Sequence, residues 1–242
     1  MIRRLFCPHL RCGPVELTEP EAHHARHVLR LKPGDAVELF DESGQTGEGV
    51  IVSVERRSVQ VKLTTIRPAG WIAPIDVFAA LPKGERSDWM IEKLSEIGVR
   101  TFTPLLTRRG ILERLRAGRM ERWQRIAIES AKQSRRAGVM RIGKETTLEE
   151  ALAACESQQA FMLTPGDDPA PLLSVLPVPG RETSLFIGPE GGWTDDESER
   201  MRSAGLTPAR LTATILRVET AAVVAAALVA CQLVVHLSGT RR

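Results

Sequence analysis

The residues best suited to chemistry lie in one short segment, where an apolar stretch runs into glycines and then into a helix start. Ser184–Gly188 reads as a buried strand, and Pro189-Glu190-Gly191-Gly192 follows it. Thr194 and Glu197 then have the spacing of a capping box, in which each side chain binds an unpaired N–H group of the first helical turn. Ligands of parallel α/β sheets bind beyond the carboxyl ends of strands, and glycines let the backbone approach a ligand closely. The segment therefore predicts a ligand-binding loop, with a plain strand-to-helix turn as the alternative.

Arginines gather in two parts of the chain, although the net charge is only +3. The two groups are Arg3, Arg4, Arg26, Arg30 and Lys32, and then Arg108, Arg109, Arg114, Arg116, Arg119, Arg122 and Arg125. The guanidinium fork binds phosphate oxygens in pairs, so these groups suit a nucleic-acid partner. Solvated helix faces are the alternative interpretation.

The cysteines indicate neither a disulfide framework nor a metal site. None of the four forms a Cys-x-x-Cys pair, and the spacing of Cys7 and Cys12 to His9 and His23 fits no standard zinc pattern. We therefore expect no metal. The basic start Met1–Arg4 is not followed by an apolar stretch, so we expect no signal peptide and a cytoplasmic, reduced protein.

The segment Thr220–Leu237 is long and apolar enough to need a membrane test. It is rich in alanine, which contributes little to membrane insertion, and it contains Gln232 and His236. A helix that is apolar all round is more often buried in a core or against another subunit. We therefore expect a buried helix and no membrane span.

The elements that position these residues fall into two parts. In the first, short β-branched stretches at Val37–Phe40, Gly49–Val54 and Val59–Leu63 predict strands, and a short helix is expected over Glu19–Leu29. These strands predict a small β-barrel-like module. Two prolines and a glycine in Arg67–Pro74 break the pattern, so we place a domain boundary there, with domains at 1–70 and 71–242.

Beyond the boundary, strands and helices alternate. Strands are expected at Ile75–Leu81, Val99–Leu106, Gln159–Leu163, Ser184–Gly188 and Ala209–Thr214. Helices are expected from an N-cap at Ser87 or Asp88 to Ile97, with Gly98 as the stop, over Arg119–Arg136, from Thr194, and at the C-terminal end. This alternation predicts an α/β domain with a mainly parallel sheet covered on both faces.

Five stretches, in this order along nearly the whole chain, are typical of a known family: His23–Asp35, Lys83–Val99, Arg122–Arg135, Ile187–Glu197 and Ile215–Ala221. On these residues the chain resembles the SPOUT class of methyltransferases and, within it, the family of ribosomal RNA small subunit methyltransferase E. Two departures stand out. Leu211–Thr214 occupies a place where the family usually has glycine and often arginine, and Met140 stands where proline is usual. Both leave the assignment to the class intact.

The resemblance implies a fold, a reaction and partners. It implies a PUA-like RNA-binding domain at the N-terminal end and a C-terminal α/β domain with a deep trefoil knot, an exception to the rule against threaded loops. The implied activity is methylation of N3 of a uridine in 16S ribosomal RNA, with S-adenosylmethionine as the methyl donor. The implied partners are 16S rRNA, expected within the small ribosomal subunit, and a second copy of the chain in a homodimer formed through the knot region and the C-terminal helix.

The resemblance also assigns roles to particular residues. Arg217 is the first candidate to stabilise the imide anion that develops on the base; pairing with Glu219 or a helix end is the alternative. Glu219 could organise Arg217, take the proton, or be structural. The expected cofactor-binding residues are Leu163, Thr164, Ile187, Gly188, Glu190, Gly192, Leu211, Ile215 and Leu216. The expected RNA-binding residues are Arg3, Arg4, Arg26, Arg30, Lys83, Arg86 and Arg135.

Two other functions stay open on the sequence. One keeps the chemistry but changes the target, for example to ribose 2′-O methylation of tRNA or rRNA. The other is a non-catalytic RNA-binding protein on a methyltransferase scaffold, which the unusual Thr212–Thr214 stretch keeps possible. Tyrosine is absent and aromatic residues make up only 4% of the chain, so base stacking is not expected as a broad RNA-binding device.

Overall fold

The computed structural model describes residues 2–56, 58–68, 73–82, 84–110, 118–157, 159–166, 168–175 and 181–239. The chain divides into two compact units. Unit 1 consists of Met1–Ile72 together with Ala131–Val139, and unit 2 consists of Ala73–Ser130 and Met140–Arg242. The segment Ala131–Val139, distant in sequence, therefore belongs to unit 1, and no local sequence pattern predicts this grouping.

Unit 1 is built on a five-stranded mixed sheet with the order β1-β3-β4-β5-β2. Its strands are β1 (Arg3–Phe6), β2 (Gly13–Glu16), β3 (Ala36–Phe40), β4 (Gln45–Val54) and β5 (Val59–Pro68). Strands β1 and β3 are parallel, and the other pairs are antiparallel. Buried and exposed side chains alternate along Val59–Leu63 as predicted from its period of two.

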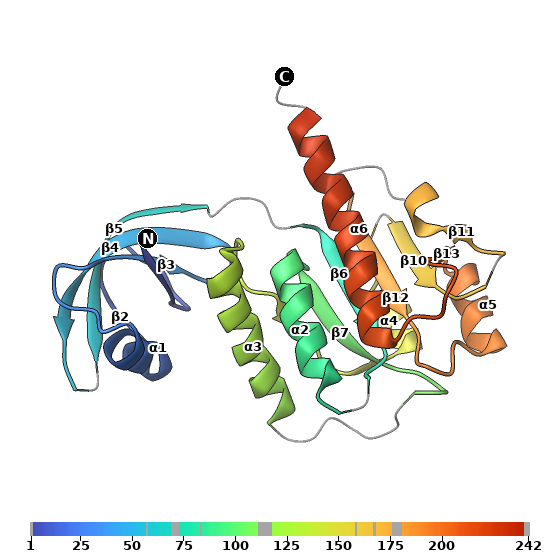
Figure 1. Cartoon of the computed structure of the whole chain (residues 1–242), viewed down its shortest axis with the longest axis horizontal. Helices are drawn as coiled ribbons and strands as arrows, with labels where there is room; N and C mark the ends of the chain where they lie inside the picture. The colour runs from blue at the N-terminus through green and yellow to red at the C-terminus, as the bar shows by residue number, and fades with distance from the viewer. Residues whose placement is uncertain are drawn as a thin grey trace. The chain divides into compact units, whose positions relative to one another are not determined.

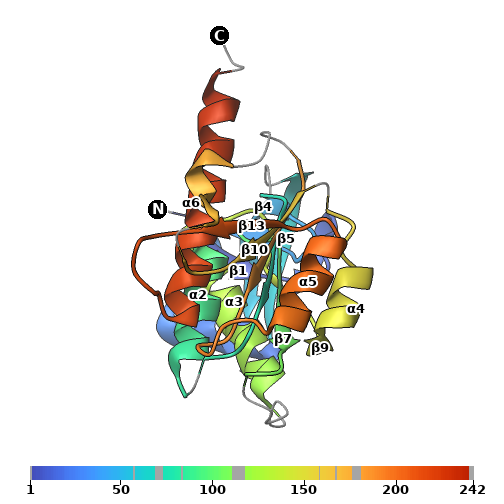
Figure 2. The same ribbon diagram turned by 90° about the vertical axis from the view of Figure 1, so that its right-hand side faces the viewer.

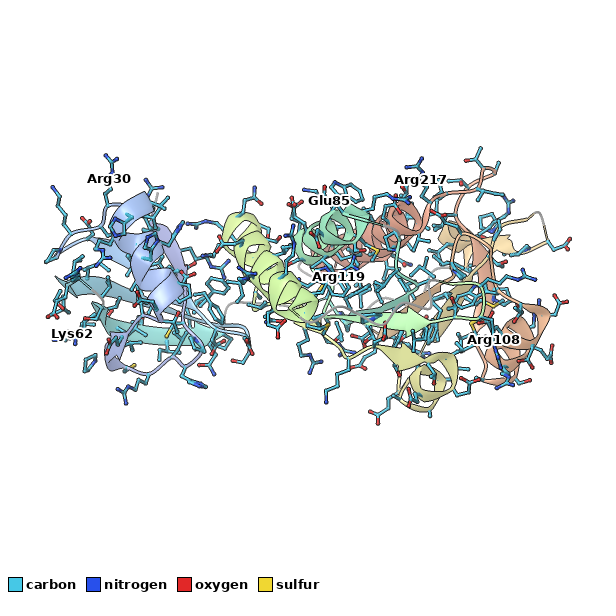
Figure 3. The ribbon with its side chains drawn as sticks, turned by 90° about the horizontal axis from the view of Figure 1, so that it is seen from below. Arg30, Lys62, Glu85, Arg108, Arg119 and Arg217 are labelled. Atoms are coloured by element: carbon cyan, nitrogen blue, oxygen red, sulfur yellow. The ribbon has the colours of Figure 1, made fainter. Side chains whose placement is uncertain are left out.

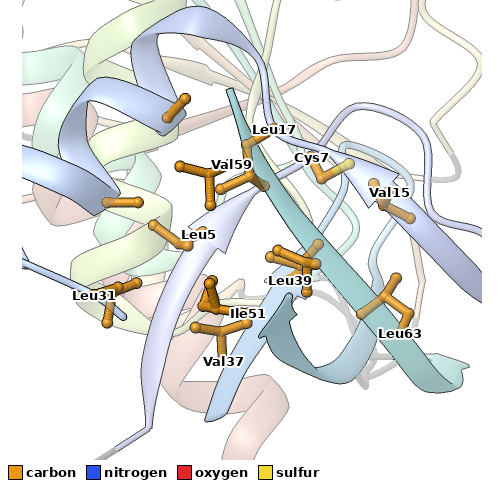
Figure 4. Close-up of a cluster of buried hydrophobic side chains, with 13 residues drawn as sticks. Leu5, Cys7, Val15, Leu17, Leu31, Val37, Leu39, Ile51, Val59 and Leu63 are labelled. Atoms are coloured by element: carbon orange, nitrogen blue, oxygen red, sulfur yellow. The ribbon is translucent and has the colours of Figure 1, made fainter. Parts of the chain in front are cut away.

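The core of unit 1 lies between this sheet and one short helical segment. Leu5, Leu39, Ile51 and Val59 are almost fully buried in it, and Figure 4 shows these side chains gathered there. The helical segment starts as α1 (Glu19–His23) and continues as a π-helix, η1 (His24–Val28). The predicted helix over Glu19–Leu29 is therefore present, but half of it has the wider π turn.

Unit 2 contains a parallel sheet with the order β11-β13-β10-β12-β6-β7-β8, in which β9 also pairs with β7. The strands are β6 (Ile75–Ala79), β7 (Thr101–Leu106), β8 (Arg141–Ile142), β9 (Thr146–Thr147), β10 (Gln159–Leu163), β11 (Ala170–Pro171), β12 (Thr183–Ile187) and β13 (Thr207–Arg210). Every pair of neighbouring strands in the described part of this sheet is parallel. The prediction of a mainly parallel α/β sheet is confirmed.

Helices cover both faces of this sheet, as Figures 1 and 2 show. One face carries α2 (Arg86–Ile97) and α6 (Val218–Gly239), with α3 (Arg119–Ser134) packed beside α2 through a hydrogen bond from Ser95 to the Ala127 carbonyl. The other face carries α4 (Leu148–Ala153) and α5 (Asp195–Ser203), whose Leu148 and Met201 enter a buried cluster. A short 3₁₀ turn, η2 (Leu172–Ser174), follows β11.

Two predicted element bounds are wrong. The strand expected at Ala209–Thr214 ends at Arg210, because the β-branched residues after it form a loop instead of a ladder. Helix α2 begins at Arg86 after an N-cap at Glu85, not after a cap at Ser87 or Asp88. Both of those side chains bind elsewhere: the Ser87 hydroxyl donates to the Pro82 carbonyl, and the Asp88 carboxylate accepts from Trp123.

Helix α6 is buried along one stripe, not all round. The buried stripe contains Val218, Ala222, Ala225, Ala226, Val229 and Leu233, and it packs against α2, β6 and β12. The opposite side stays accessible in the single chain, where Val234 is 58% and Val235 is 72% exposed. By length and composition alone Val218–Val235 could cross a membrane, a property that core helices of soluble proteins share.

Candidate functional site

Three neighbouring strands of unit 2 end at one edge of the sheet. Leu163 at the end of β10 pairs with Ile187 of β12 on one side and with Ala209 of β13 on the other. Since all three strands run in the same direction, the loops that follow them meet at their carboxyl ends. This is the edge at which parallel α/β sheets bind ligands.

A cavity of about 270 Å³ lies between these loops. It is lined by Leu163, Thr164, Pro165, Ile187–Trp193, Leu211, Thr212, Thr214, Ile215, Leu216, Val218 and Ala221. All nine residues expected from the sequence to bind a cofactor are in this lining. A second cavity, of about 480 Å³, lies at the opposite edge, where Gln159 and Thr207 begin their strands. The first cavity is the candidate site because only it lies at the carboxyl ends.

The 188–193 loop (Gly188–Trp193) is held against the sheet by an indole ring. Trp193 is only 8% exposed, and its Nε1–H donates to the Leu163 carbonyl at 2.9 Å. Gly188 lies so close that a Cβ atom there would be 2.9 Å from Cε2 of that ring. Gly192 has a φ of +71°, which favours glycine. The glycines of this loop thus allow it to close over Trp193.

Two further groups fix the same loop from outside. Arg109, in the loop after β7, donates from Nη1 to the carbonyls of Gly191 and Trp193 at 3.1 and 3.2 Å. The predicted capping box is confirmed: Thr194 accepts from the Glu197 N–H, and the Glu197 carboxylate accepts from the Thr194 N–H at 2.8 Å. The contact of Arg109 was missed by the sequence analysis, because nothing near Arg109 in the sequence announces a partner 82 residues away.

Arg86 joins two walls of the cavity through carboxylates. Its Nη1 lies 3.2 Å from Oε1 of Glu190 in the 188–193 loop and 3.4 Å from Oε1 of Glu219 at the start of α6. The Glu219 side chain is only 7% exposed, and its Oε2 has no hydrogen-bond partner among the described residues. The observed contact of Glu219 is therefore with Arg86, not with Arg217. Arg86, expected to bind RNA, has carboxylate partners here.

The 211–217 loop (Leu211–Arg217) forms the remaining wall and is far more accessible. Thr212–Ile215 are exposed, and Ile215 reaches 80%. A hydrogen bond from the Thr212 hydroxyl to the Thr214 carbonyl, at 2.7 Å, closes the loop on itself. Arg217 is exposed, and Figure 3 shows it at this edge of the unit. Within the described part of the chain, no hydrogen bond or ion pair holds its side chain.

Known proteins resemble this chain in both sequence and fold. Residues 71–230 match the family model of an RNA methyltransferase domain, and residues 17–64 match that of an RNA methyltransferase PUA domain. The ribosomal RNA small subunit methyltransferase E of Synechocystis is 32% identical over 218 residues, which cover 88% of this chain and 71% of the relative. The chain belongs to the ribosomal RNA small subunit methyltransferase E family.

Solved structures agree with this membership. The methyltransferase E of Neisseria gonorrhoeae, determined bound to S-adenosyl methionine, has a TM-score of 0.84 and 28% identity, with 97% of this chain and 98% of that one covered. A methyltransferase from Legionella pneumophila, determined with its bound cofactor SAM, has a TM-score of 0.86 and 26% identity, with 96% and 98% covered. Unit 1 of this methyltransferase E family member contains the PUA-like domain, and the methyltransferase domain is α/β.

In the PUA-like unit, one arginine expected to bind RNA is buried instead. Arg4 is 8% exposed, and it donates to the carbonyls of Ala131 and Arg136 at 3.0 and 2.8 Å. Its Nε lies 3.0 Å from Glu38, and burial lowers its pKa. The Arg4 guanidinium is thus used inside the unit, and RNA binding by Arg4 stays a prediction. A cluster of arginines in the sequence does not show whether a given arginine binds RNA or packs inside the protein.

The other arginines of this unit that were expected to bind RNA are accessible. Arg3, Arg30 and Arg135 are exposed, and Arg26 is partly exposed. Arg135 donates to the Ile2 carbonyl at 2.8 Å, and Arg26 donates to the Glu55 carbonyl at 2.8 Å. Lys83, also expected to bind RNA, lies outside the described residues. Across the described ranges, no group of three His, Cys, Asp or Glu side chains could hold a metal ion.

Proposed function

We propose that this chain methylates N3 of a specific uridine in 16S ribosomal RNA, with S-adenosylmethionine as its cofactor. The observation that carries the proposal is the cavity at the carboxyl ends of β10, β12 and β13, lined by all nine residues expected to bind the cofactor. The names of the relatives support the rRNA target, and the solved relatives that contain the cofactor support its identity. The position on the base comes from the family resemblance.

The residues present fit this cofactor. Leu163, Ile187, Leu211 and Leu216 give the cavity an apolar lining suited to a flat purine ring. Gly188 and Gly191 leave room for the loop backbone, since a Cβ at either would be within 3.2 Å of Trp193 or Arg109. Glu190 offers a carboxylate for a ribose hydroxyl. When bound, S-adenosylmethionine supplies a methyl group on a positively charged sulfur.

Two residues beside the cavity lining in the sequence, Arg217 and Glu219, could supply what the base needs. N3 of uridine carries a proton and becomes a good nucleophile only when that proton leaves. Arg217 is exposed next to the lining residue Leu216, so its guanidinium can stabilise the negative charge that develops on the base. Glu219 is the candidate proton acceptor, because its Oε2 has no hydrogen-bond partner within the described ranges. Holding N3 in line with the methyl group contributes through proximity and orientation.

The PUA-like domain would bind the RNA backbone. The proposed phosphate-binding residues are the accessible Arg3, Arg26, Arg30 and Arg135, together with Lys83. The target base would be turned out of the folded RNA toward the cavity. We keep the division into domains 1–70 and 71–242 as part of this proposal, with the deep trefoil knot in the second.

The accessible side of α6 supports the proposed homodimer. Val234 and Val235 are exposed large apolar side chains on a helix with no charged residue between Thr220 and Val235. Such a surface is more stable when another protein surface covers it. The proposal is a cytoplasmic homodimer that acts on 16S rRNA within the small ribosomal subunit. Light scattering on purified protein would test it, and a monomer at micromolar concentration would contradict it.

The modified-nucleoside profile of 16S rRNA tests the reaction. A strain without this protein should lack 3-methyluridine in that RNA, and the purified protein should restore it. Unchanged 3-methyluridine would refute the proposal, and loss of a ribose-methylated nucleoside would favour the 2′-O alternative. Calorimetry with S-adenosylmethionine tests the non-catalytic alternative, since a scaffold without activity would release no heat of binding.

A further inference from the structure

One surface turn of unit 1 has a backbone that costs stability. In η1 (His24–Val28) the Leu29 N–H donates to the His24 carbonyl, five residues back, at 3.0 Å. This wide turn is rare and occurs frequently at functional sites. Arg30 follows with a φ of +54°, a left-handed conformation that costs a residue other than glycine about 1 kcal/mol. Two unfavourable backbone features therefore follow one another within the seven residues His24–Arg30.

Ala25 of this turn packs into the core of unit 1, and four side chains around it face solvent. His23, His27 and Arg30 are exposed, and Val28 is 62% exposed. Figure 3 shows Arg30 pointing away from unit 1. Within the described residues, no hydrogen bond or ion pair holds the Arg30 side chain. Since packing inside unit 1 does not use these side chains, the strained backbone presents them to something outside it.

Two of these side chains form a pair of tilted rings in contact. The imidazole centroids of His23 and His27 are 4.5 Å apart, with 39° between their planes. The Arg26 Nε–H donates to Nε2 of His27 at 2.9 Å, and Arg26 is itself fixed by the Glu55 carbonyl. A ring nitrogen that accepts a hydrogen bond carries no proton, so His27 is neutral and held in place.

The surroundings of His27 favour its neutral form. Partial removal from water, and then the neighbouring Arg26 and His23, lower the pKa of His27. A neutral imidazole attracts phosphate only weakly, but its flat face suits stacking on another ring. The phenylalanine rings of this unit, Phe6 and Phe40, are buried and present no such face.

We propose that His23–Arg30 binds one unpaired RNA nucleotide, whose base stacks on the His23–His27 ring pair while Arg30 binds the adjoining phosphate. The proposal rests on the proposed RNA-methyltransferase function and adds a preference to it. A base in a duplex has both faces covered by its neighbours. The site therefore requires a single-stranded or bulged nucleotide. Nε2 of His27 already accepts a hydrogen bond, which makes a metal ion a poorer occupant than a base.

Fluorescence anisotropy with the full chain tests this site. The probes are a short labelled single-stranded RNA and the same strand in a duplex. His27→Ala should weaken binding of the single strand about tenfold, the cost of losing one stacked base, and leave duplex binding unchanged. His27→Phe keeps a ring face and should bind the single strand within about twofold of the wild type. Lys62→Ala, an exposed residue of β5 labelled in Figure 3, is the matched control for a change on this unit.

Three results would overturn the proposal: full binding by His27→Ala, equal losses in His27→Ala and His27→Phe, or an equal loss for single strand and duplex. His27 is exposed, so a folding defect is not expected, and a melting curve of each variant checks this. Methyl transfer by the wild type to 16S rRNA is measured in parallel. If transfer occurs and His27→Ala binds normally, only the stacking site fails. If transfer is absent, the proposed function fails, and the RNA-binding series still decides the site.

Discussion

The two loops that form opposite walls of the cavity differ in how they are held. The 188–193 loop is fixed by the Trp193 indole, by Arg109, by the Arg86–Glu190 pair and by the capping box of α5. The 211–217 loop is mostly exposed, and its side-chain hydrogen bonds in the described part of the chain run between Thr212 and Thr214, within the loop itself.

This difference separates two tasks. A wall that binds the cofactor benefits from a shape that exists before binding, because binding then costs no conformational entropy for ordering the loop. A wall that meets a large RNA can complete its shape when the RNA, or a second subunit, arrives. We therefore expect substitutions in the first wall to change cofactor affinity. In the second wall, whose Leu211 and Leu216 also line the cavity, we expect substitution of the exposed Arg217 to change turnover.

Arg217→Ala should give the largest effect. Loss of the charge that stabilises the developing anion is expected to lower turnover about 10²- to 10³-fold, as for other groups of this kind. Cofactor affinity, measured by calorimetry, should stay within about threefold of the wild type. Arg202→Ala, an exposed arginine on α5, is the control. A large loss of cofactor affinity in Arg217→Ala would contradict the assignment of cofactor binding and turnover to different parts of the two walls.

Gly188→Ala should damage the other wall. The new Cβ would be 2.9 Å from a ring that is itself packed in the core, so the loop must shift. We expect the free energy of unfolding to fall by about 1–3 kcal/mol and cofactor affinity to fall at least about tenfold. Ala213→Ser makes a change of similar size in the exposed 211–217 loop and should have almost no effect. Equal effects of the two substitutions would contradict the comparison.

Arg86→Ala tests the link between the walls. It leaves the buried Glu219 without its positive partner and frees Glu190. Because Arg86 is about one third exposed, water screens part of the loss, and cofactor affinity should fall about tenfold. Arg86→Lys should recover part of it. If only RNA affinity falls, Arg86 binds phosphate as the sequence first suggested, and the carboxylate bridge is unimportant.

Thr194→Ala should have the smallest effect. Removing this cap is expected to cost about 1 kcal/mol and lower the Tm by about 2–4 °C, with a modest loss of cofactor affinity. Thr147→Ala removes the equivalent capping box of α4, whose residues do not line the cavity. It should cost similar stability and leave cofactor binding unchanged. If neither variant alters affinity, the cap sets only the stability of α5.

The sequence predicted the parts of this structure that local patterns encode. The alternation of Val59–Leu63, the bounds Gln159–Leu163 of β10, the Gly98 stop and the Thr194–Glu197 cap all depend on neighbours in the chain, and all are present. The loop at Thr212–Thr214 was mistaken for a strand because β-branched residues favour strands when no tertiary contact decides otherwise.

The contacts that cross the fold were not predictable in this way. Arg4, Arg86 and Arg109 look alike in the sequence, since each is an arginine with another basic residue within three positions. In the structure Arg4 binds carbonyls inside unit 1, Arg86 bridges two carboxylates, and Arg109 fixes a loop. These carbonyls and the two carboxylates at Arg86 lie between 82 and 133 residues away in the sequence. Only folding brings these groups together.

The packing of Gly188, Trp193 and Leu163 has a consequence for how this sequence can vary. A larger residue at 188 requires a smaller one at 193, and loss of the indole N–H leaves the Leu163 carbonyl without its donor. Effects at positions in contact do not add. We therefore expect a single replacement at one of these positions to destabilise the protein more than a compensating pair does. In evolution the three residues should then change together or not at all.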